Sequence, residues 1–442
     1  MNAARKKAAI RTVVGQEARE TSRLVSAIWE LAEPPFQEHR SARLIADYLA
    51  GHGFRVTFPF KQVPTAFKAV RGRGRPVIGM LGEYDALPDC GLEPGSYGHA
   101  CGHNLLGVAP AVGAVAAATL LDARTQAGRV VYWGCPAEEA LAGKVYMARD
   151  GGFRGMDACL CWHPSADNRV RAAGGSALDS LVFEFRGRTA HAGGAPERGR
   201  SALDAAMLMD VAVNYLREHT PENVRIHCVI RDGGTAPNVV PAYAKIWYYV
   251  RAVDRAQVDD VTRRLICCAR GAAVATETRV KVTKVTAMYS RLRNQALAEL
   301  LRDNLVLMGA PRATKADRER VEALGKEPNF ATRVQTDISA EPGRASSDED
   351  TVSWLAPLGG FSVACVAKGT TGHHREYTRQ TNLPFAHRAT RRAAEVLAGA
   401  AWDLFTGRKL LAKVQAEFKA GTKGFRFDPL IPKGQRPPLK GI

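Results

Sequence analysis

Four features that mark membrane, secreted, disulfide-rich or repeat proteins are missing from these 442 residues. No uninterrupted apolar run is long enough to cross a bilayer, so a membrane protein is not expected. The basic start MNAARKKAAIR is followed by neither an apolar segment nor a cleavage site, which argues against a signal peptide. The nine cysteines, two of them adjacent, do not have the pattern of a disulfide framework, and internal repeats are absent. We therefore expect a cytoplasmic protein whose cysteines are mostly buried hydrophobes, with one or two functional thiolates.

Acidic residues are too few to balance the basic ones. The chain has 44 Asp and Glu against 62 Lys and Arg, which gives a formal net charge of +18. This excess would suit nucleic acid or a membrane surface, but the basic residues are scattered in short clusters such as RKK at 5–7 and RGRGR at 71–75. No RNA-binding or zinc-finger pattern accompanies them. We interpret the charge as a solvated surface that attracts small anions, with neither nucleic acid nor a membrane as partner.

Strand and helix signals alternate along the first part of the chain. Apolar segments at 76–81, 129–134 and 158–163 predict strands, and the small-residue segment 108–123 predicts a closely packed helix. This alternation is typical of an α/β sheet with flanking helices. Amphipathic helices are expected before it, for example over 41–53, where a glycine ends the pattern.

The pattern changes between residues 178 and 287. The order there is strand, helix, strand, strand, helix, strand, which is the split βαβ sandwich, a self-contained α+β module. Helix and strand signals resume after it, and the length of the chain favours two domains. We expect a catalytic domain in two parts, 1–177 and 288–442, interrupted by a smaller domain at 178–287. The Pro-rich end, FDPLIPKGQRPPLKGI, is expected to be extended.

Side chains able to bind a metal recur just past the predicted strand ends. The carboxyl ends of strands in open α/β sheets are where ligand sites form. A borderline divalent ion accepts thiolate, imidazole and carboxylate, and a carboxylate beside the ligands can take the proton of a bound water. Each residue alone has an ordinary alternative, as a buried thiol, a core histidine or part of a solvated acidic turn. Together they predict a hydrolytic metal site formed by Glu83, Asp85, Cys101, His103, Glu138, Glu139 and His163.

Seven motifs occur in the order seen in one known family. The chain resembles the aminoacylase-like family of dinuclear metallopeptidases and amidohydrolases, which includes hippurate hydrolases and indole-acetyl amino acid hydrolases. Within that family, it is most similar to the aminobenzoyl-glutamate utilisation branch. The resemblance implies a zinc-peptidase-like mixed α/β sheet with flanking helices, interrupted by an inserted α+β (βαββαβ) dimerisation or lid domain. The motifs are GEYDALP, GHACGHN, CPAEE, WHPS, GRTAHA, GTAPNVVP and SSDEDTVSW.

The resemblance also implies roles for the site residues. Two divalent ions, manganese, zinc or cobalt, would be held with Cys101 as a bridging thiolate. Glu138 matches the general base that activates the water, and Asp85 would orient His103 from behind. The implied metal ligands are Cys101, His103, Glu139, His163 and His373.

The resemblance gives less definite roles to five positions, which are four histidines and one asparagine. In GTTGHHREY, the Gly-His step favours His373 over His374 as the last ligand, and His99 is at least as readily a structural histidine as a ligand. In the smaller domain, His191 resembles a lid histidine that stabilises an oxyanion in the other subunit, which implies a homodimer or a higher homo-oligomer. Asn238 resembles a residue that contacts the polar end of the substrate. The ordinary alternatives for these two are a capping histidine and a turn asparagine.

Two positions depart from the family pattern. Asn104 stands where relatives commonly have an aspartate, which would remove a negative charge beside the metals. Thr351 stands where relatives often carry an acidic residue. Both departures bear on the substrate more than on the presence of the site.

The residues together with the family resemblance predict a dinuclear-metal hydrolase acting on a C–N bond other than a peptide bond. The expected substrate is the amide of an N-acyl or N-aroyl amino acid, aminobenzoyl-glutamate-like, whose negative charge suits a basic protein. The same groups permit hydrolytic deamination of an electron-poor aromatic amine, such as a substituted anthranilate, with release of ammonia. A third alternative is a non-catalytic binding protein on a hydrolase scaffold, against which the intact Glu138 argues.

Overall fold

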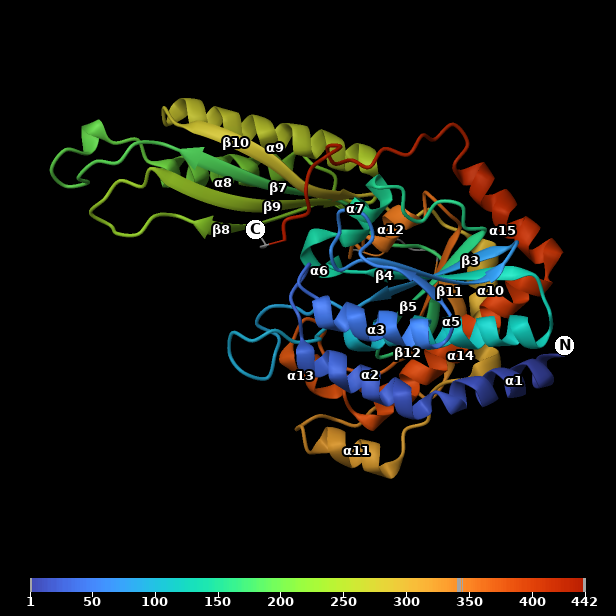
Figure 1. The fold of residues 1–442 in the computed structure, drawn as a ribbon. Helices are drawn as coiled ribbons and strands as arrows, with labels where there is room; N and C mark the ends of the chain where they lie inside the picture. Colours follow the sequence, from blue (N-terminus) through green and yellow to red (C-terminus); the bar gives the residue numbers. More distant parts are fainter. Residues whose placement is uncertain (1, 340–342, 344, 440–442) are drawn as a thin grey trace.

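Two separate sheets organise the chain, which a computed structural model describes for residues 2–339, 343 and 345–439 (Figure 1). The larger sheet has eight strands and mixes parallel with antiparallel neighbours, as the predicted fold class requires. In spatial order its strands are β1 (Arg55–Thr57), β2 (Phe67–Arg73), β4 (Gly128–Cys135), β3 (Val77–Glu83), β5 (Ala158–Ser165), β12 (Leu358–Ala364), β6 (Asn168–Arg171) and β11 (Val334–Ser339).

The centre of this sheet is parallel. Strands β4, β3, β5 and β12 pair in parallel with their neighbours, whereas β1, β2 and β6 add antiparallel pairings toward the edges. All seven residues of β3 are buried, which is typical of a parallel strand covered on both faces. The carboxyl ends of the parallel strands therefore meet at one edge, where the predicted metal-binding residues follow them.

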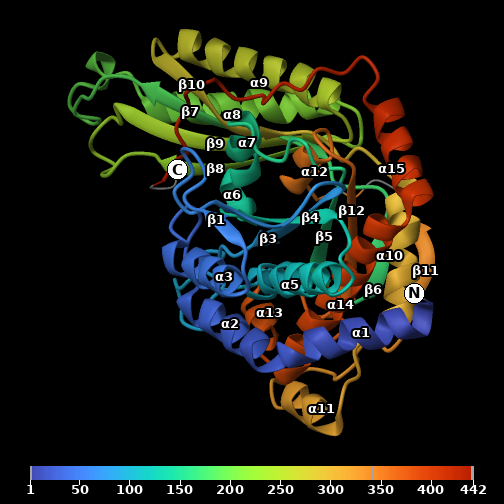
Figure 2. The same cartoon turned by 45° about the vertical axis from the view of Figure 1, so that its right-hand side comes forward.

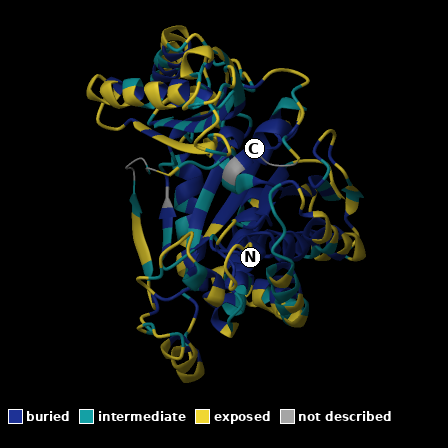
Figure 3. Ribbon diagram, turned by 90° about the vertical axis from the view of Figure 1, so that its left-hand side faces the viewer, coloured by how far each residue is buried: buried dark blue, intermediate teal, exposed yellow. Residues whose placement is uncertain are grey.

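Helices cover both faces of the larger sheet (Figures 1 and 2). Helix α5 packs closely against α14, since a Cβ atom added at Gly113 would lie 3.1 Å from the Cβ atom of Leu397. Figure 3 shows the interior of this part as continuously buried. The helices are α1 (Ala3–Gln16), α2 (Ala18–Leu31), α3 (His39–Gly51), α4 (His103–Leu106), α5 (Val108–Ala123), α6 (Glu138–Leu141), α7 (Gly143–Arg149), α10 (Gln295–Met308), α11 (Lys315–Glu322), α12 (Glu349–Val352), α13 (Arg375–Gln380), α14 (Pro384–Thr406) and α15 (Arg408–Gly421).

One helical stretch of the described chain has a mean hydropathy like that of a membrane span, although polar residues interrupt its apolar run. The helical segment His103–Ala123 is long and apolar enough to cross a membrane by length and composition alone. However, 94% of its apolar window is buried inside the protein, where it packs against the sheet and α14. Its composition is therefore that of a core helix.

The second sheet has four antiparallel strands with two long helices on one face. Its strand and helix order confirms the predicted β-α-β-β-α-β pattern. Along β9, buried and half-buried residues alternate, so one face of the strand packs under the two helices, while Trp247 and Tyr249 on the other face pack against the core of the larger body. In spatial order the strands are β10 (Arg279–Met288), β7 (Ala177–Arg186), β9 (Tyr243–Ala252) and β8 (Arg225–Asp232), and the helices are α8 (Ala202–Glu218) and α9 (Arg255–Ala275), with a short 3-10 turn η1 (Pro196–Arg198).

The C-terminal segment leaves α15 and crosses to the second sheet (Figure 2). Its described part, up to residue 439, contains turns and extended chain, in agreement with the prediction, and residues 440–442 lie outside the described residues. The Gln435 amide donates to the carbonyl oxygens of Lys284 and Val285 on β10, at 3.0 Å each, and to Tyr146 Oη on α7 at 3.3 Å. The segment thus ties β10 to the larger body.

Candidate metal centre

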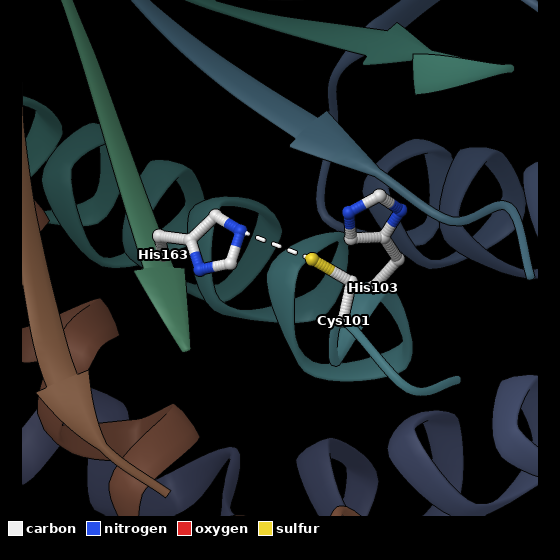
Figure 4. Close-up of side chains that lie close together, drawn as sticks. All are labelled: Cys101, His103 and His163. Atoms are coloured by element: carbon white, nitrogen blue, oxygen red, sulfur yellow. Dashed lines mark hydrogen bonds between the residues drawn. The ribbon is translucent and has the colours of Figure 1, made fainter. Parts of the chain in front are cut away.

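The segment GHACGHN bends so that Cys101 and His103 face the same space as His163 (Figure 4). The bend depends on Gly102, whose φ of +79° lies in the left-handed region that favours glycine. A Cβ atom at this position would also lie 2.9 Å from the Cβ atom of Pro164, next to His163. Gly102 therefore allows the loop to approach the end of β5 closely, and α4 begins directly after it at His103.

Ligand atoms from four different segments gather around the sulfur of Cys101. This atom groups with nitrogen atoms of His103 and His163, and separately with Glu139 and His373, and within each group all ligand atoms lie within 4.8 Å of one another. The Cys101 Sγ to His163 Nε2 distance is 3.4 Å, and the Glu139 Oε2 to His373 Nε2 distance is 3.5 Å. A thiol shared by two donor groups could contact two ions at once.

His103 is oriented as a metal-binding imidazole. Its Nδ1 atom donates to Asp85 Oδ1 at 2.9 Å, which leaves the lone pair of Nε2 directed at the cluster. His103 is 1% exposed, and Nε2 is buried without a hydrogen-bond partner. Because an unpaired buried nitrogen is costly, and because thiolate, imidazole and carboxylate donors surround it, the residues present fit a borderline divalent ion.

Glu138 and Glu139 lie on a short helix whose backbone is held from both ends. Ala137 and Ala142 flank α6 with φ values of +58° and +53°. Residues other than glycine rarely adopt this left-handed backbone conformation. The Ala137 amide donates to the buried carboxylate of Glu38 at 2.8 Å, and the Glu139 amide donates to Asp85 Oδ2 at 3.0 Å. Asp85 therefore orients both His103 and the acidic turn. Sequence reasoning missed Glu38, which carries no signal in its own segment.

The acidic pair lies in an environment that disfavours negative charge. Burial raises the pKa of Glu138 well above its usual value, and the nearby carboxylates of Glu83 and Asp348 raise it further. Burial also raises the pKa of Glu139, to about 7, against the opposing effect of His103. Within the described chain, Glu138 has no hydrogen-bond or ion-pair partner. Its carboxyl group is thus free to exchange a proton with a bound molecule.

The two neighbouring histidines near the C-terminus have different surroundings. His373 belongs to the Cys101 cluster, and its side chain is 59% exposed on the open side of the site. Its amide donates to the Ala100 carbonyl at 3.0 Å, and its backbone adopts a left-handed φ of +56°. His374 instead caps α13, where its Nδ1 accepts from the Glu376 amide at 3.4 Å. The structure therefore brings His373, and not His374, to the cluster.

Comparison with known proteins identifies the family. Residues 176–276 match the peptidase dimerisation domain of M20 peptidases. A subunit of the p-aminobenzoyl-glutamate hydrolase of Escherichia coli is 35% identical over 460 residues, covering 94% of this chain and 96% of that protein. The chain belongs to the M20 family. Human Xaa-Arg dipeptidase is 29% identical over 92% of this M20 chain and 90% of its own length. A dinuclear metal-binding M20 peptidase from Bacillus subtilis shares the fold with a TM-score of 0.56 and 19% identity, over 87% of this chain and 98% of that one.

In this M20 protein, the two predicted lid residues lie together but apart from the chain's own cluster. His191 forms an isolated β-bridge with Val239, and the Ala192 amide donates to the Asn238 carbonyl at 3.0 Å. Both His191 and Asn238 are exposed, and the loops that carry them extend beyond the far end of the second sheet (Figure 1). Among the described residues, neither forms a hydrogen bond or ion pair with the cluster.

Two residues of β9 lie near enough to the acidic pair for Glu138 to affect their pKa values, and sequence reasoning missed both. Tyr249 and Arg251 lie on the face of β9 that is turned toward the larger body, and Tyr249 packs against its core. The Arg251 guanidinium lies 5.5 Å from the Tyr249 ring centroid, and its buried Nε atom has no hydrogen-bond partner. Burial lowers the pKa of Arg251, while the nearby Glu138 opposes that shift. The alternation in KIWYYVRAV was the available signal, since it places Arg251 on the less buried face.

Two other residues singled out in the sequence face away from the cluster. His99 is 1% exposed, and its Nε2 atom lies 3.0 Å from the Ile28 carbonyl; burial lowers its pKa to about 4. Asn104 donates from its amide nitrogen to the Thr381 carbonyl at 3.1 Å. An aspartate could not donate this bond, so Asn104 serves the packing of α4 against neighbouring segments.

Proposed function

We propose that this M20 protein is a metal-dependent amidohydrolase that releases the amino acid from an N-acyl or N-aroyl amino acid. Aminobenzoyl-glutamate-like compounds are the leading substrates. The observation that carries the proposal is the sulfur of Cys101, which belongs to two donor groups and lies near the unpaired carboxyl group of Glu138. The Escherichia coli relative, which is part of a p-aminobenzoyl-glutamate hydrolase, supports the same substrate class.

Five residues would hold two divalent ions, with manganese, zinc and cobalt as candidates. Cys101 would bridge them, His103 and His163 would complete one donor group, and Glu139 and His373 the other. When bound, the ions would polarise the scissile carbonyl and lower the pKa of a water molecule.

Glu138 acts as the proton carrier of the reaction. It accepts a proton from the attacking water as the new C–O bond forms, and it delivers that proton to the amine nitrogen as the C–N bond breaks. Its raised pKa suits both steps, because the carboxyl group must hold the proton until the amine departs. Its lack of a fixed partner lets the side chain reach both atoms.

Arg251 anchors the carboxylate of the substrate. A planar guanidinium binds a carboxylate through two parallel hydrogen bonds, and Arg251 offers an unpaired buried Nε atom near the cluster. An N-acyl amino acid would place its carboxylate there and its amide at the metals. This arrangement favours anionic substrates over neutral amides.

The proposal also includes the division of the chain into domains and the location of the protein in the cell. The catalytic domain comprises 1–177 and 288–442, and the lid and dimerisation domain comprises 178–287. All nine cysteines are free thiols, which suits a reducing cytoplasm.

The protein forms a homodimer through β8 and α8. Strand β8 is an edge of the four-stranded sheet, so its backbone can pair with a second copy. Beside it, α8 exposes an apolar stripe, and Arg217 on α8 donates to the Ile226 carbonyl of β8. In such a dimer, His191 and Asn238 would act in the partner's site. The exposed apolar residues of this surface are Met207, Leu208, Val211, Tyr215, Val229 and Ile230.

Replacing Val211 and Tyr215 together with aspartate should convert the dimer to a monomer. Burying two carboxylates in the interface is unfavourable, so sedimentation should give the 47.8 kDa chain mass and not twice that value. Activity should also fall when the dimer dissociates, because His191 and Asn238 then have no partner site in which to act. Val274→Asp is the matched control, since Val274 is 80% exposed on the other lid helix and should leave the mass unchanged. A double variant that sediments as a dimer would exclude this surface.

Product analysis tests the proposed activity. Protein loaded with Mn²⁺ or Zn²⁺ is mixed with aminobenzoyl-glutamate, other N-acyl amino acids, a dipeptide ending in arginine and electron-poor anthranilates, and products are read by mass spectrometry. We expect a free amino acid and a carboxylic acid from the first two classes. Ammonia with a hydroxylated ring would instead establish hydrolytic deamination, and metal-loaded protein that converts none of the panel would reject the proposal.

Arg251→Met is the matched variant for this assay. It should raise KM for aminobenzoyl-glutamate about ten- to a hundredfold, the loss expected for a charge-assisted hydrogen bond, with a smaller effect on kcat. The penalty should disappear for a substrate whose carboxylate is amidated. An equal penalty on both substrates would mean that Arg251 does not contact the carboxylate.

A further inference from the structure

A fully buried lysine lies beside the metal-binding cluster and is used by no step described above. Lys144, on α7, is 0% exposed. Its Nζ atom donates to Glu83 Oε1 and to Asp348 Oδ1, at 2.5 Å each, and its backbone amide donates to Asp348 Oδ2 at 2.8 Å. Asp348 thus holds Lys144 at two points, and the ammonium in turn fixes one oxygen of Glu83.

The second oxygen of Glu83 is directed at the cluster. Glu83 is the last residue of β3, and its Oε2 atom lies 3.4 Å from His103 Nε2. This is the same nitrogen that is buried without a hydrogen-bond partner. Ligand atoms of Glu83, His103 and Glu138 lie within 4.8 Å of one another, which is a third possible donor group beside the two that share Cys101.

The cost of burying three charges indicates that this arrangement serves a purpose other than stability. Removing an ammonium and two carboxylates from water is unfavourable, and apolar residues of similar volume would often serve stability equally well. The three residues come from segments far apart in the chain, since Lys144 and Asp348 are separated by 204 positions. Together, the three residues hold one carboxylate oxygen of Glu83 at a defined position next to Nε2 of His103.

We propose that Glu83 supplies a further oxygen donor to the metal centre, and that Lys144 and Asp348 are positioning residues that hold it there. This inference rests on the proposed function for the presence of the metals. The fixed carboxylate completes the coordination of the ion bound by His103 on the side of Glu138. Because Oε1 is retained by Lys144, Glu83 binds through Oε2 alone.

Metal binding to the metal-free protein tests the role of Glu83 directly. The probe is Co²⁺, followed by calorimetry and by its visible absorption bands, which respond to the number and type of donors. Glu83→Gln keeps the shape of the side chain, and we expect at least one ion to bind tenfold more weakly or more, with a changed cobalt spectrum. The melting temperature of the metal-free variant should stay close to that of the wild type.

Lys144→Met combined with Asp348→Asn tests the positioning role, because the pair removes the ammonium without leaving both carboxylates unpaired. It should reproduce the weakened binding and altered spectrum of Glu83→Gln. The matched control is Lys6→Met, which removes another buried lysine, paired with Asp403. It should alter stability without altering cobalt binding.

Wild-type cobalt affinity and spectrum in Glu83→Gln would overturn the proposal and leave the three residues a structural ion cluster. If only the paired Lys144 and Asp348 variant fails to fold, the Glu83→Gln result decides. Since the readout is metal binding, a protein that binds cobalt but converts no substrate would reject the proposed activity while this test stays decisive.

Discussion

Replacing Glu138 with glutamine is expected to reduce turnover about 10²–10⁴-fold, the usual contribution of a general acid–base group, while both metals stay bound. The amide cannot accept the proton of the attacking water, whereas its size and shape match those of the carboxyl group. Glu138 lies in a buried acidic turn whose backbone is anchored through Ala137 and Glu139, so the substitution should leave the turn in place. The loss should therefore appear in kcat, with metal content unchanged.

The measurement pairs steady-state kinetics with metal analysis of the same sample. Glu30→Gln, at an exposed glutamate on α2, is the control for the chemical change itself and should retain full activity. Turnover of Glu138→Gln within tenfold of the wild type would remove Glu138 as the base. Reduced metal content would instead identify it as a ligand.

Replacing Cys101 with alanine is expected to remove metal from both donor groups, because its sulfur is the atom that they share. Burial and the Glu139 carboxylate raise the pKa of the Cys101 thiol, so in the metal-free protein it is a neutral thiol that must lose its proton to bind an ion. Without this sulfur, each of the two groups that contain Cys101 keeps only two of its three ligand atoms. Activity should fall together with metal content.

Metal content after dialysis is the readout for Cys101→Ala. Cys365→Ala serves as the matched control, since Cys365 is also buried in the larger body but lies 3.4 Å from the Val363 carbonyl and belongs to none of the donor groups. That variant should lose stability only, through the small cavity it creates. Unchanged metal stoichiometry with full activity in Cys101→Ala would return this cysteine to the role of a buried hydrophobe.

Much of the fold was predictable because it depends on local patterns. The apolar run at 76–81 became β3, and the small-residue segment 108–123 became α5. Both follow from periodicity and composition within a single segment. Composition alone could not settle the membrane question, because a core helix and a membrane helix have similar composition and only the surrounding protein distinguishes them.

The sequence by itself determined which chemical groups follow the parallel strands. Asp85 and the acidic pair follow predicted strands closely, Cys101 and His103 lie in the segment between two of them, and the topology of a parallel sheet brings such positions to one edge. A thiol, imidazoles and carboxylates in that position indicate a metal site before any distance is known. The family motifs then imply the type of reaction.

Only the tertiary structure decided which further side chains lie close to the predicted site. His373 and His374 are adjacent in sequence, and the contact of His373 with Ala100 selects between them. Arg251 comes from the lid sheet, and Lys144 is paired with a residue 204 positions away. The local patterns indicate at most the face or motif on which these groups lie, because their burial and charge pairing depend on segments that meet only when the chain folds.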